Sequence, residues 1–493
     1  MALDSRRIVD HAFTGLSVLS IVLMAAALLV ILLPMFVRGV GAYVFRGTVE
    51  RREMVLEKFG RGDRQSIEAE LETAAEARAP LYGMLREHEE ALWRRLEEQA
   101  AARETEPEVM DRISGRQGSL TEAMYAYEET LRLREFDAQD RLDVLREDVE
   151  KYEEVKELVA QLLGPMPWEE RPLMARRQYG ETRWDRTQVA LHDLLYYEDY
   201  EWTDSNEMAQ RVEKERKQLF TGTALEPMFG YARRNVEAMM RPRWTFYWRF
   251  LFDSSTDAHF FGGIWPELLG TIYLTVGAMI FALPMGVIAA IYLTEYAGRG
   301  RLISLLRSCI STLAGVPSIV FGLFGLAFFI NTLHVSEAKS VLAGSLTLAL
   351  LVLPTVIRAS EEAIRSVPQT YKEAALSMGA SKWRAVVTVI LPAALPGILT
   401  GTIISMGRAA GETAPIIFTA AVSAGSALKP WEVFTRGTPA LPWNIYNIAT
   451  EHEAVDQIRH VQYGMVFTLI AVVLLLNAVA LIVRARISKK LRG

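Results

Sequence analysis

Long apolar stretches separated by strongly charged segments form the main pattern of the sequence. About 20 apolar residues are needed for a helix to cross a hydrocarbon core, and windows of that length predict six membrane helices in the chain. The first apolar run is much longer than the roughly 7 to 15 residues of a signal-peptide core, so we expect a retained helix. The pattern indicates an all-α membrane protein, with helices near residues 13–37, 267–293, 304–330, 341–357, 393–424 and 464–483.

The segment between the first two predicted membrane helices is instead rich in Glu, Arg, Ala and Leu. One amphipathic helix is predicted from about Ile67 to Leu96. In a second, apolar residues recur in steps of three and four, the spacing of one helical face. We therefore expect a large helical, coiled-coil-like insertion, either a solvated spacer or a docking domain. The second apolar face consists of Leu142, Leu145, Val149, Tyr152, Val155, Val159 and Leu162.

Aromatic and arginine residues alternate just before the second predicted membrane helix, in "RPRWTFYWRFLF" at 241–252. Tryptophan and tyrosine are enriched where a membrane meets water. The segment therefore fits either a membrane interface or a buried edge of the insertion.

Short basic loops predict the orientation in the membrane, because excess Lys and Arg stay cytoplasmic. Arg6 and Arg7, "AGRGR" at 297–301 and the terminal "VRARISKKLR" fall on one side if six helices cross. Both termini are then cytoplasmic. The expected parts are residues 1–38 with the first membrane helix, an outer insertion at 39–262, and a core at 263–493 with the other five helices.

Composition and motifs exclude several function classes. The net charge is only −5 and no nucleic-acid-binding signature occurs, so we expect no nucleic-acid partner. The seven histidines lack the spacing of metal ligands, and the single cysteine, Cys309, can form no internal disulfide. No Gly-Lys dipeptide occurs, so a phosphate-binding loop of the Walker A kind cannot be written.

A charged loop at 361–392 joins the fourth and fifth predicted membrane helices. Its sequence "QTYKEAALSMGA" predicts a short surface helix that ends at Gly379 in the left-handed conformation favoured by glycine. A second helix should begin after Ser381 as N-cap. Such a helical knuckle fits a groove on a partner protein.

Four charged residues lie in or beside predicted membrane helices. Arg408 and Glu412, within "GRAAGETAP", are spaced i,i+4, and Arg358 and Glu361 are spaced i,i+3, so each pair shares one helical face. A lone arginine at the bilayer centre costs about 2.5 to 3.5 kcal/mol on insertion scales, and pairing lowers that cost. Each pair is therefore either a functional site or a clip that fixes helix packing.

The loop resembles the coupling loop of ABC importer permeases: "EAALSMG", nine residues, then "VILP", with Val389 where the family usually has Ile. The segments "GVPSIVFGLFGL" (315–326), "LPAALPGILTGTIISMGRAAGETAPIIFTA" (391–420) and "LPWNIYN" (441–447) are similar to the PstA family of phosphate importer permeases. The likeness is strong over 260–490 and weak over the first helix. It does not extend to 39–260.

This resemblance implies a non-catalytic bacterial inner-membrane permease of the type I ABC importer kind, with six membrane helices and a periplasmic insertion. It implies inward phosphate transport with a PstC-like second permease, a PstB-like ATPase dimer and a PstS-like periplasmic phosphate-binding protein. The chain needs no cofactor, because the partner ATPase binds ATP.

The resemblance also implies roles for single residues. Glu373, Ala374, Ala375 and Gly379 would contact the ATPase mechanically. Arg408, Glu412, Arg358 and Glu361 would line the substrate pathway, each arginine resting against its carboxylate until phosphate arrives. The planar guanidinium is well matched to phosphate, and a glutamate could accept the proton that sulfate lacks.

Two alternatives stay open from the sequence. The coupling loop is common to importers of other oxyanions, so a sulfate, molybdate or phosphonate permease is one. An envelope sensor or scaffold, with the insertion as its working part, is the other, and the short inner loop argues against it.

Overall fold

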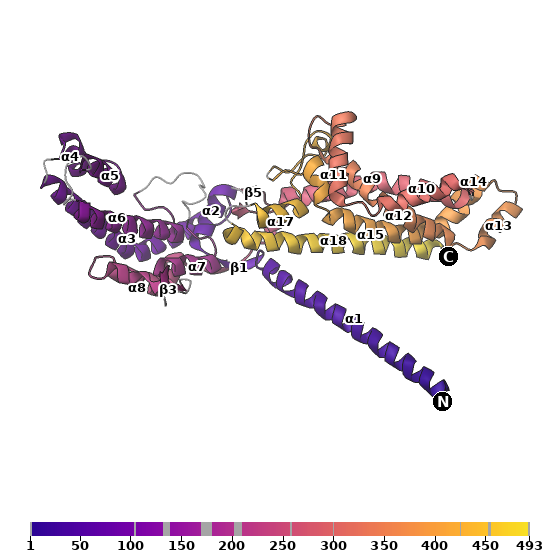
Figure 1. Ribbon diagram of the computed structural model, residues 1–493, viewed down its shortest axis with the longest axis horizontal. Coiled ribbons are helices and arrows are strands. Elements are labelled where there is room, and N and C mark those ends of the chain that lie inside the picture. The colour runs from indigo at the N-terminus through magenta and orange to yellow at the C-terminus, as the bar shows by residue number, and fades with distance from the viewer. Residues whose placement is uncertain are drawn as a thin grey trace. The chain divides into compact units, whose positions relative to one another are not determined.

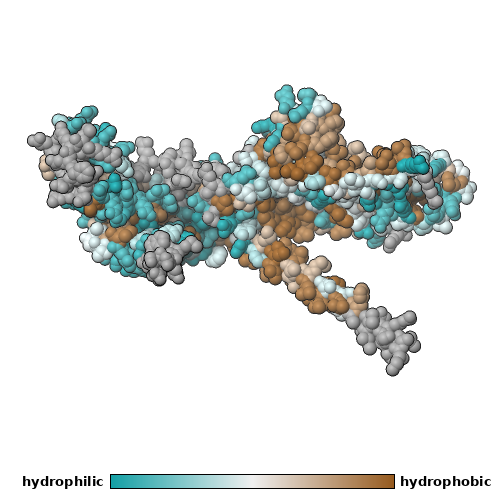
Figure 2. Space-filling model, in the orientation of Figure 1, coloured by the Kyte–Doolittle hydropathy of each residue, from teal (hydrophilic) through white to brown (hydrophobic). Residues whose placement is uncertain are grey.

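A computed structural model describes residues 2–102, 105–131, 139–168, 180–201, 210–256, 259–298, 300–423, 425–451 and 455–491. The chain forms two compact units, one of Met1–Tyr43 with Tyr247–Gly493 and the other of Val44–Phe246. Hydrophobic side chains gather around α11 in the first unit, whereas the second has a largely polar surface (Figure 2). We call them the membrane unit and the insertion. The expected division at 38 and 262 concerned membrane sidedness, which stays a prediction.

The membrane unit is a bundle of long apolar helices (Figure 1). Within the described residues, five segments are long and apolar enough to span a membrane: Phe13–Val40, Trp265–Tyr296, Val341–Arg365, Lys382–Gly411 and Gln457–Lys489. Helix α12 packs against α9 and α15, and α15 packs against α18. The bundle helices are α9 (Trp265–Ile291), α12 (Val341–Arg365), α15 (Leu391–Gly411) and α18 (Val455–Leu491); the apolar stretch of α1 (Ala2–Val40) is not buried by the rest of the chain.

The sixth predicted span, 304–330, is not one straight helix. Its two halves, Arg301–Leu313 and Ser318–Thr332, meet at an angle of 102°. Pro317 lacks a backbone N–H and disfavours helical geometry at the residue before it, so the helix breaks there. The first half is α10 (Arg301–Leu313), and the second consists of α11 (Ser318–Gly325) and the π-helical η4 (Leu326–Thr332).

Small residues let the helices of the membrane unit approach closely. A Cβ atom at Gly401 of α15 would collide with Ala359 of α12, and one at Gly344 of α12 would collide with Ala420. In a lipid environment there is little hydrophobic drive between helices, so such close contacts supply much of the packing energy. Gly401 therefore sets the spacing of α12 and α15, and Gly344 sets that of α12 and the residue after α16 (Ala414–Thr419).

The remaining elements of the membrane unit are short. They are η2 (Trp248–Leu251), β5 (Ser255–Thr256), β6 (Phe261–Gly262), η3 (Tyr292–Tyr296), α13 (Gln369–Ser377), α14 (Lys382–Ala385), η5 (Val386–Ile390), α16 (Ala414–Thr419), η6 (Glu432–Phe434) and α17 (Leu441–Thr450). Strands β5 and β6 pair antiparallel. The predicted fifth span, 393–424, thus ends at Gly411 and resumes as the short α16.

The insertion is built around amphipathic helices, as its sequence predicts. The helix predicted for Ile67–Leu96 lies within α3, and the apolar face from Leu145 to Leu162 on α6 is buried, whereas the side chain of Leu142 lies outside the described set. Elements here are α2 (Val49–Phe59), α3 (Arg64–Ala101), α4 (Pro107–Ser114), α5 (Leu120–Leu131), α6 (Gln139–Leu163), α7 (Trp184–Leu195), β2 (Tyr196–Glu201), β3 (Gln210–Glu215), η1 (Arg216–Phe220) and α8 (Glu226–Met240).

One buried ion pair ties several helices of the insertion together. Arg78 of α3 contacts Glu50 of α2 at 2.7 Å. The same guanidinium donates hydrogen bonds to the backbone oxygens of Leu163, at the end of α6, and Met239 in α8. Because both side chains are buried, each charge depends on these partners for stabilisation.

The chain enters and leaves the insertion through a two-stranded ribbon. Strand β1 (Val44–Gly47) pairs antiparallel with β4 (Arg243–Phe246), and Gly47 lies opposite Arg243. All residues between these two positions therefore form a loop at the end of one hairpin. The hydrophobic clusters of the membrane unit draw only on residues outside Val44–Phe246.

This arrangement predicts that the insertion can be removed cleanly. Replacing residues 48–242 by Asn-Gly should close the ribbon as a two-residue hairpin, leaving the membrane unit folded. Size-exclusion chromatography and a thermal transition in detergent, compared with the intact chain, check this. Aggregation of the shortened chain would show that the membrane unit depends on the insertion.

Candidate functional site

Arg408 lies beside a helix break, about half-way along the length of the bundle. Its neighbour Ala409, in the last turn of α15, packs in one cluster with Met279 and Ala282 of α9 and with Leu351 of α12. These residues lie near the midpoints of α9 and α12. The chain leaves helical geometry at Glu412, so α15 ends about half-way along its neighbours.

The predicted pairing of Arg408 with Glu412 is present. The Nε atom of Arg408 lies 3.1 Å from Oε1 of Glu412, and 41% of the arginine side chain is exposed. An exposed guanidinium at this depth is unfavourable against lipid. The surface around Arg408 therefore suits water or another protein rather than acyl chains.

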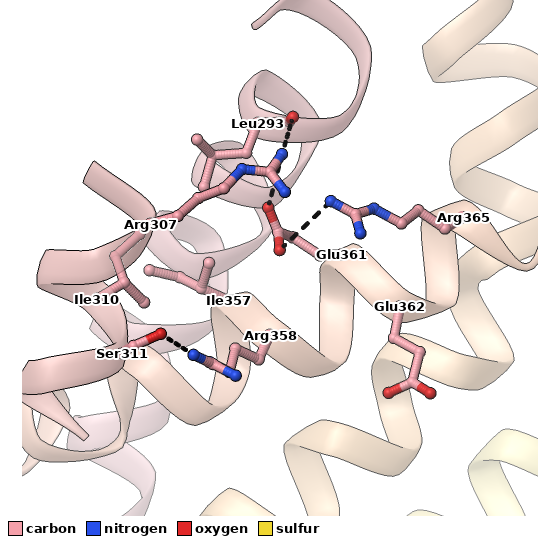
Figure 3. A pocket seen from close by; sticks show the side chains of 9 residues that line it. All are labelled: Leu293, Arg307, Ile310, Ser311, Ile357, Arg358, Glu361, Glu362 and Arg365. Atoms are coloured by element: carbon pink, nitrogen blue, oxygen red, sulfur yellow. Dashed lines mark hydrogen bonds and ion pairs between the residues drawn. The ribbon is translucent and has the colours of Figure 1, made fainter. Parts of the chain in front are cut away.

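A second polar site lies between α10 and α12 (Figure 3). An open cavity of about 520 Å³ is bordered there by polar and charged side chains. Its lining consists of Leu293, Arg307, Ile310, Ser311, Ile357, Arg358, Glu361, Glu362 and Arg365. Three arginines and two glutamates leave one net positive charge, which favours a small anion.

The partners in this cavity differ from the predicted pair. Arg358 donates to the hydroxyl of Ser311, whereas Glu361 lies 3.7 Å from Arg307 and 3.9 Å from Arg365. The prediction that Arg358 rests against Glu361 is therefore wrong for this structure. Arg365 has the i,i+4 spacing to Glu361 that suits a helical ion pair, and Arg307 reaches Glu361 from α10.

Sequence reasoning missed Arg307 and its neighbours because they lie in an apolar predicted span. Ser304, Arg307 and Ser311 recur at helical spacing, which was a usable signal for a polar face. Arg307 is held in place by a 2.7 Å hydrogen bond to the backbone oxygen of Leu293. Arg408 and Glu412 do not line this cavity, so the structure places the predicted pathway residues at two separate positions.

The predicted surface helix and its caps are present. Helix α13 ends before Gly379, whose φ of +82° is the left-handed conformation expected there. Ser381 accepts a hydrogen bond from the backbone N–H of Arg384 and so caps α14. Glu373, Ala374 and Gly379 are exposed and Ala375 is half-buried, so this knuckle presents its surface outward.

One ion pair connects the knuckle to the bundle. Lys372 of α13 contacts Glu295 of η3, the segment that continues α9. This ion pair links α13 directly to the segment that continues α9. Helices that span a membrane, a break beside an ion pair at mid-depth and an exposed helical knuckle together define a multi-pass membrane permease.

Comparison with known proteins narrows this class. The family model "Binding-protein-dependent transport system inner membrane component" matches residues 282–493. The chain is 34% identical over 239 residues to the "Probable ABC transporter permease protein YqgI" of Bacillus subtilis, covering 47% of this chain and 80% of that protein. It is 36% identical over 247 residues to the "Phosphate transport system permease protein PstA 1" of Mycobacterium tuberculosis, covering 50% and 78%.

The chain belongs to the PstA-type family of ABC transporter permeases, multi-pass proteins of the inner membrane that perform no catalysis themselves. The predictions of an all-α permease and of its family are thereby confirmed. A structure of the MetNI methionine ABC transporter in inward-facing conformations matches 46% of this chain and 94% of its own at 18% identity. The TM-score of this match is 0.36.

Proposed function

We propose that this chain is the transmembrane permease subunit of an ATP-driven importer that moves inorganic phosphate into the cytoplasm. The relatives named phosphate transport system permeases, at 35–36% identity over about half of the chain, carry this proposal. Its partners are a PstC-like second permease, a PstB-like ATPase dimer and a PstS-like periplasmic phosphate-binding protein. ATP binds to the ATPase subunits, and this chain holds no cofactor.

The basic segments support cytoplasmic termini and a periplasmic insertion. The ion pair between Lys372 and Glu295 brings α13 to the start of the "AGRGR" loop. The C-terminal end of α18 lies at the same end of the bundle as α13 (Figure 1). Because excess positive charge stays cytoplasmic, this end faces the ATPase, and residues 39–262 lie on the opposite side.

Arg408 is the proposed mid-membrane contact for phosphate. It uses Nε to hold Glu412, and within the described part of the chain its two terminal nitrogens make no hydrogen bond. Those nitrogens form the planar fork that binds phosphate oxygens in pairs. When the pathway is empty Glu412 balances the charge, and an arriving anion takes over that task.

The cavity between α10 and α12 is the proposed inner contact. Among the described residues, Arg358 is bound only to a neutral hydroxyl, so it is positioned to turn toward an anion. Arg307 and Arg365 hold Glu361 at ion-pair distance, so a negatively charged ligand competes with Glu361 for both guanidinium groups. Binding that trades one anion for another keeps affinity moderate, which a transported ligand requires for release.

Substitution at the mid-membrane pair tests this proposal. A hydrogen bond to a charged group is worth roughly 1.5–3 kcal/mol, so Arg408→Ala should lower phosphate uptake at limiting phosphate by about tenfold or more. Uptake is measured in vesicles that contain all subunits and ATP. Replacing Arg408 and Glu412 together by Leu should abolish uptake.

The chain offers a matched control for that experiment. Arg436 and Glu432 form another i,i+4 pair, also at 3.1 Å, outside the membrane spans. Replacing both by Leu should leave uptake nearly unchanged. If the Arg408/Glu412 double variant transports phosphate normally, the pair is a packing clip and the proposed contact is wrong.

Glu412 is the proposed source of selectivity for phosphate over sulfate. A carboxylate can accept the proton of hydrogen phosphate, whereas it repels fully ionised sulfate. Glu412→Gln should therefore increase competition by sulfate against phosphate uptake, with Glu432→Gln as the control. Unchanged competition would remove this role, and preferential uptake of sulfate or molybdate by the unmodified chain would assign the permease to another oxyanion.

Substitution of Gly379 tests whether the knuckle couples this chain mechanically to the ATPase. No atom lies within 4 Å of a Cβ built there, so only the positive φ opposes a side chain. Left-handed geometry costs about 1–2 kcal/mol for ordinary residues, so Gly379→Val should lower uptake several-fold, while Gly379→Asn restores most of it. Gly298→Val, at another open position but without positive φ, is the control; equal effects at both glycines would contradict the proposal.

A further inference from the structure

The two faces of the ribbon formed by β1 and β4 carry different side chains. Residues directly opposite in an antiparallel pair share a face, and neighbours along a strand alternate. Phe45 is only 5% exposed and lies under the guanidinium groups of Arg51 and Arg183, at 4.6 Å and 4.1 Å. This face packs against the insertion itself.

The other face of the ribbon carries uncovered apolar side chains. Val44 lies opposite Phe246, and Trp244, two residues before Phe246 on β4, lies on the same face. Their exposed fractions are 41%, 69% and 76%. We call these three residues the ribbon patch. Large aromatic side chains at such exposure on one strand indicate a surface that meets something other than water.

The foot of the ribbon is fixed to the membrane unit. The backbone N–H of Tyr247 donates to the oxygen of Tyr43 at 2.7 Å, extending the strand pairing by one step. The hydroxyl of Tyr43 lies 2.6 Å from the hydroxyl of Thr468, inside the apolar span Gln457–Lys489. At about 3.3 Å per residue, the backbone of Trp244 is at most roughly 10 Å along the strand from Tyr247.

Aromatic residues continue from the foot of the ribbon to the start of a membrane span. The ring of Trp248 lies 5.9 Å from that of Phe252, which lies 5.6 Å from that of Trp265, the first residue of α9. Trp248 and Phe252 are also more than half exposed. Such rings are typical of the boundary between acyl chains and headgroups.

We propose that the ribbon patch lies in the interfacial layer of the lipid bilayer and anchors the base of the insertion there. Its height is set by the covalent connection to Tyr43 and Tyr247. Arg46, the polar residue on this face, is neutralised by Glu237 at 2.8 Å, so the face brings no unpaired charge to the lipid. The interfacial layers are some 5–8 Å thick on each side of the hydrocarbon core, a thickness comparable to the roughly 3 to 10 Å of strand that separates Tyr247 from Phe246 and Trp244.

Single spin labels on the full chain test this placement. In a Cys309→Ser background, the variants Trp244→Cys, Phe246→Cys and Thr245→Cys are labelled with a nitroxide and reconstituted with the other subunits in phosphatidylcholine vesicles. Labels at 244 and 246 should collide with oxygen more than with a water-soluble nickel chelate. Thr245, on the other face, and Tyr200→Cys, at a 63% exposed position of the insertion, supply the comparison.

Each outcome decides the proposal. If labels at 244 and 246 meet the nickel chelate as often as one at 200, the patch faces water and the proposal fails. If they meet neither reagent, a protein partner covers the patch and the proposal also fails. A second measurement needs no cysteine substitution. Brominated lipids should quench less tryptophan fluorescence in Trp244→Phe than in the unmodified protein. Equal quenching in the two proteins would contradict contact of Trp244 with lipid.

Discussion

A guanidinium half-way through an apolar layer is the constraint on which the rest of the membrane unit depends. Arg408 has to be stabilised by a counter-charge and by polar surroundings. Glu412 supplies the first, at 3.1 Å. Its backbone is no longer helical, so the break in the chain that places this carboxylate beside Arg408 is part of the same arrangement. The exposed arginine in turn requires a polar neighbour outside this chain.

The packing around that break explains why the charges stay in position. Gly325 of α11 lies against Thr347 of α12 and Thr419 of α16 so closely that any Cβ would collide. Gly401 brings α15 equally close to α12. These contacts hold α12, α15 and α16 at fixed separations, so the two polar sites keep their spacing.

The features that could be predicted from sequence are local ones. The left-handed Gly379, the Ser381 cap and the buried face of α6 each follow from a few neighbouring residues, and all are present. The ion pair between Glu361 and Arg307 could not be predicted from the sequence. Arg307 is far from Glu361 in the sequence, and its approach depends on the bend before Pro317. Spacing alone allowed both Arg358 and Arg365 as partners of Glu361, while tertiary packing brought Arg307 to Glu361 and Ser311 to Arg358.

The two units obey different physical rules, which explains why one chain can contain both. Water drives the insertion together, since its apolar faces are buried and its central charges, Arg78 and Glu50, are paired. Lipid supplies no such drive, so the membrane unit relies on close contacts of small residues. Because the chain enters and leaves the insertion through the paired strands β1 and β4, and each unit has its own hydrophobic clusters, a change in the insertion's core need not disturb the helices around Arg408. The residues matched by the family model, 282–493, all lie in the membrane unit.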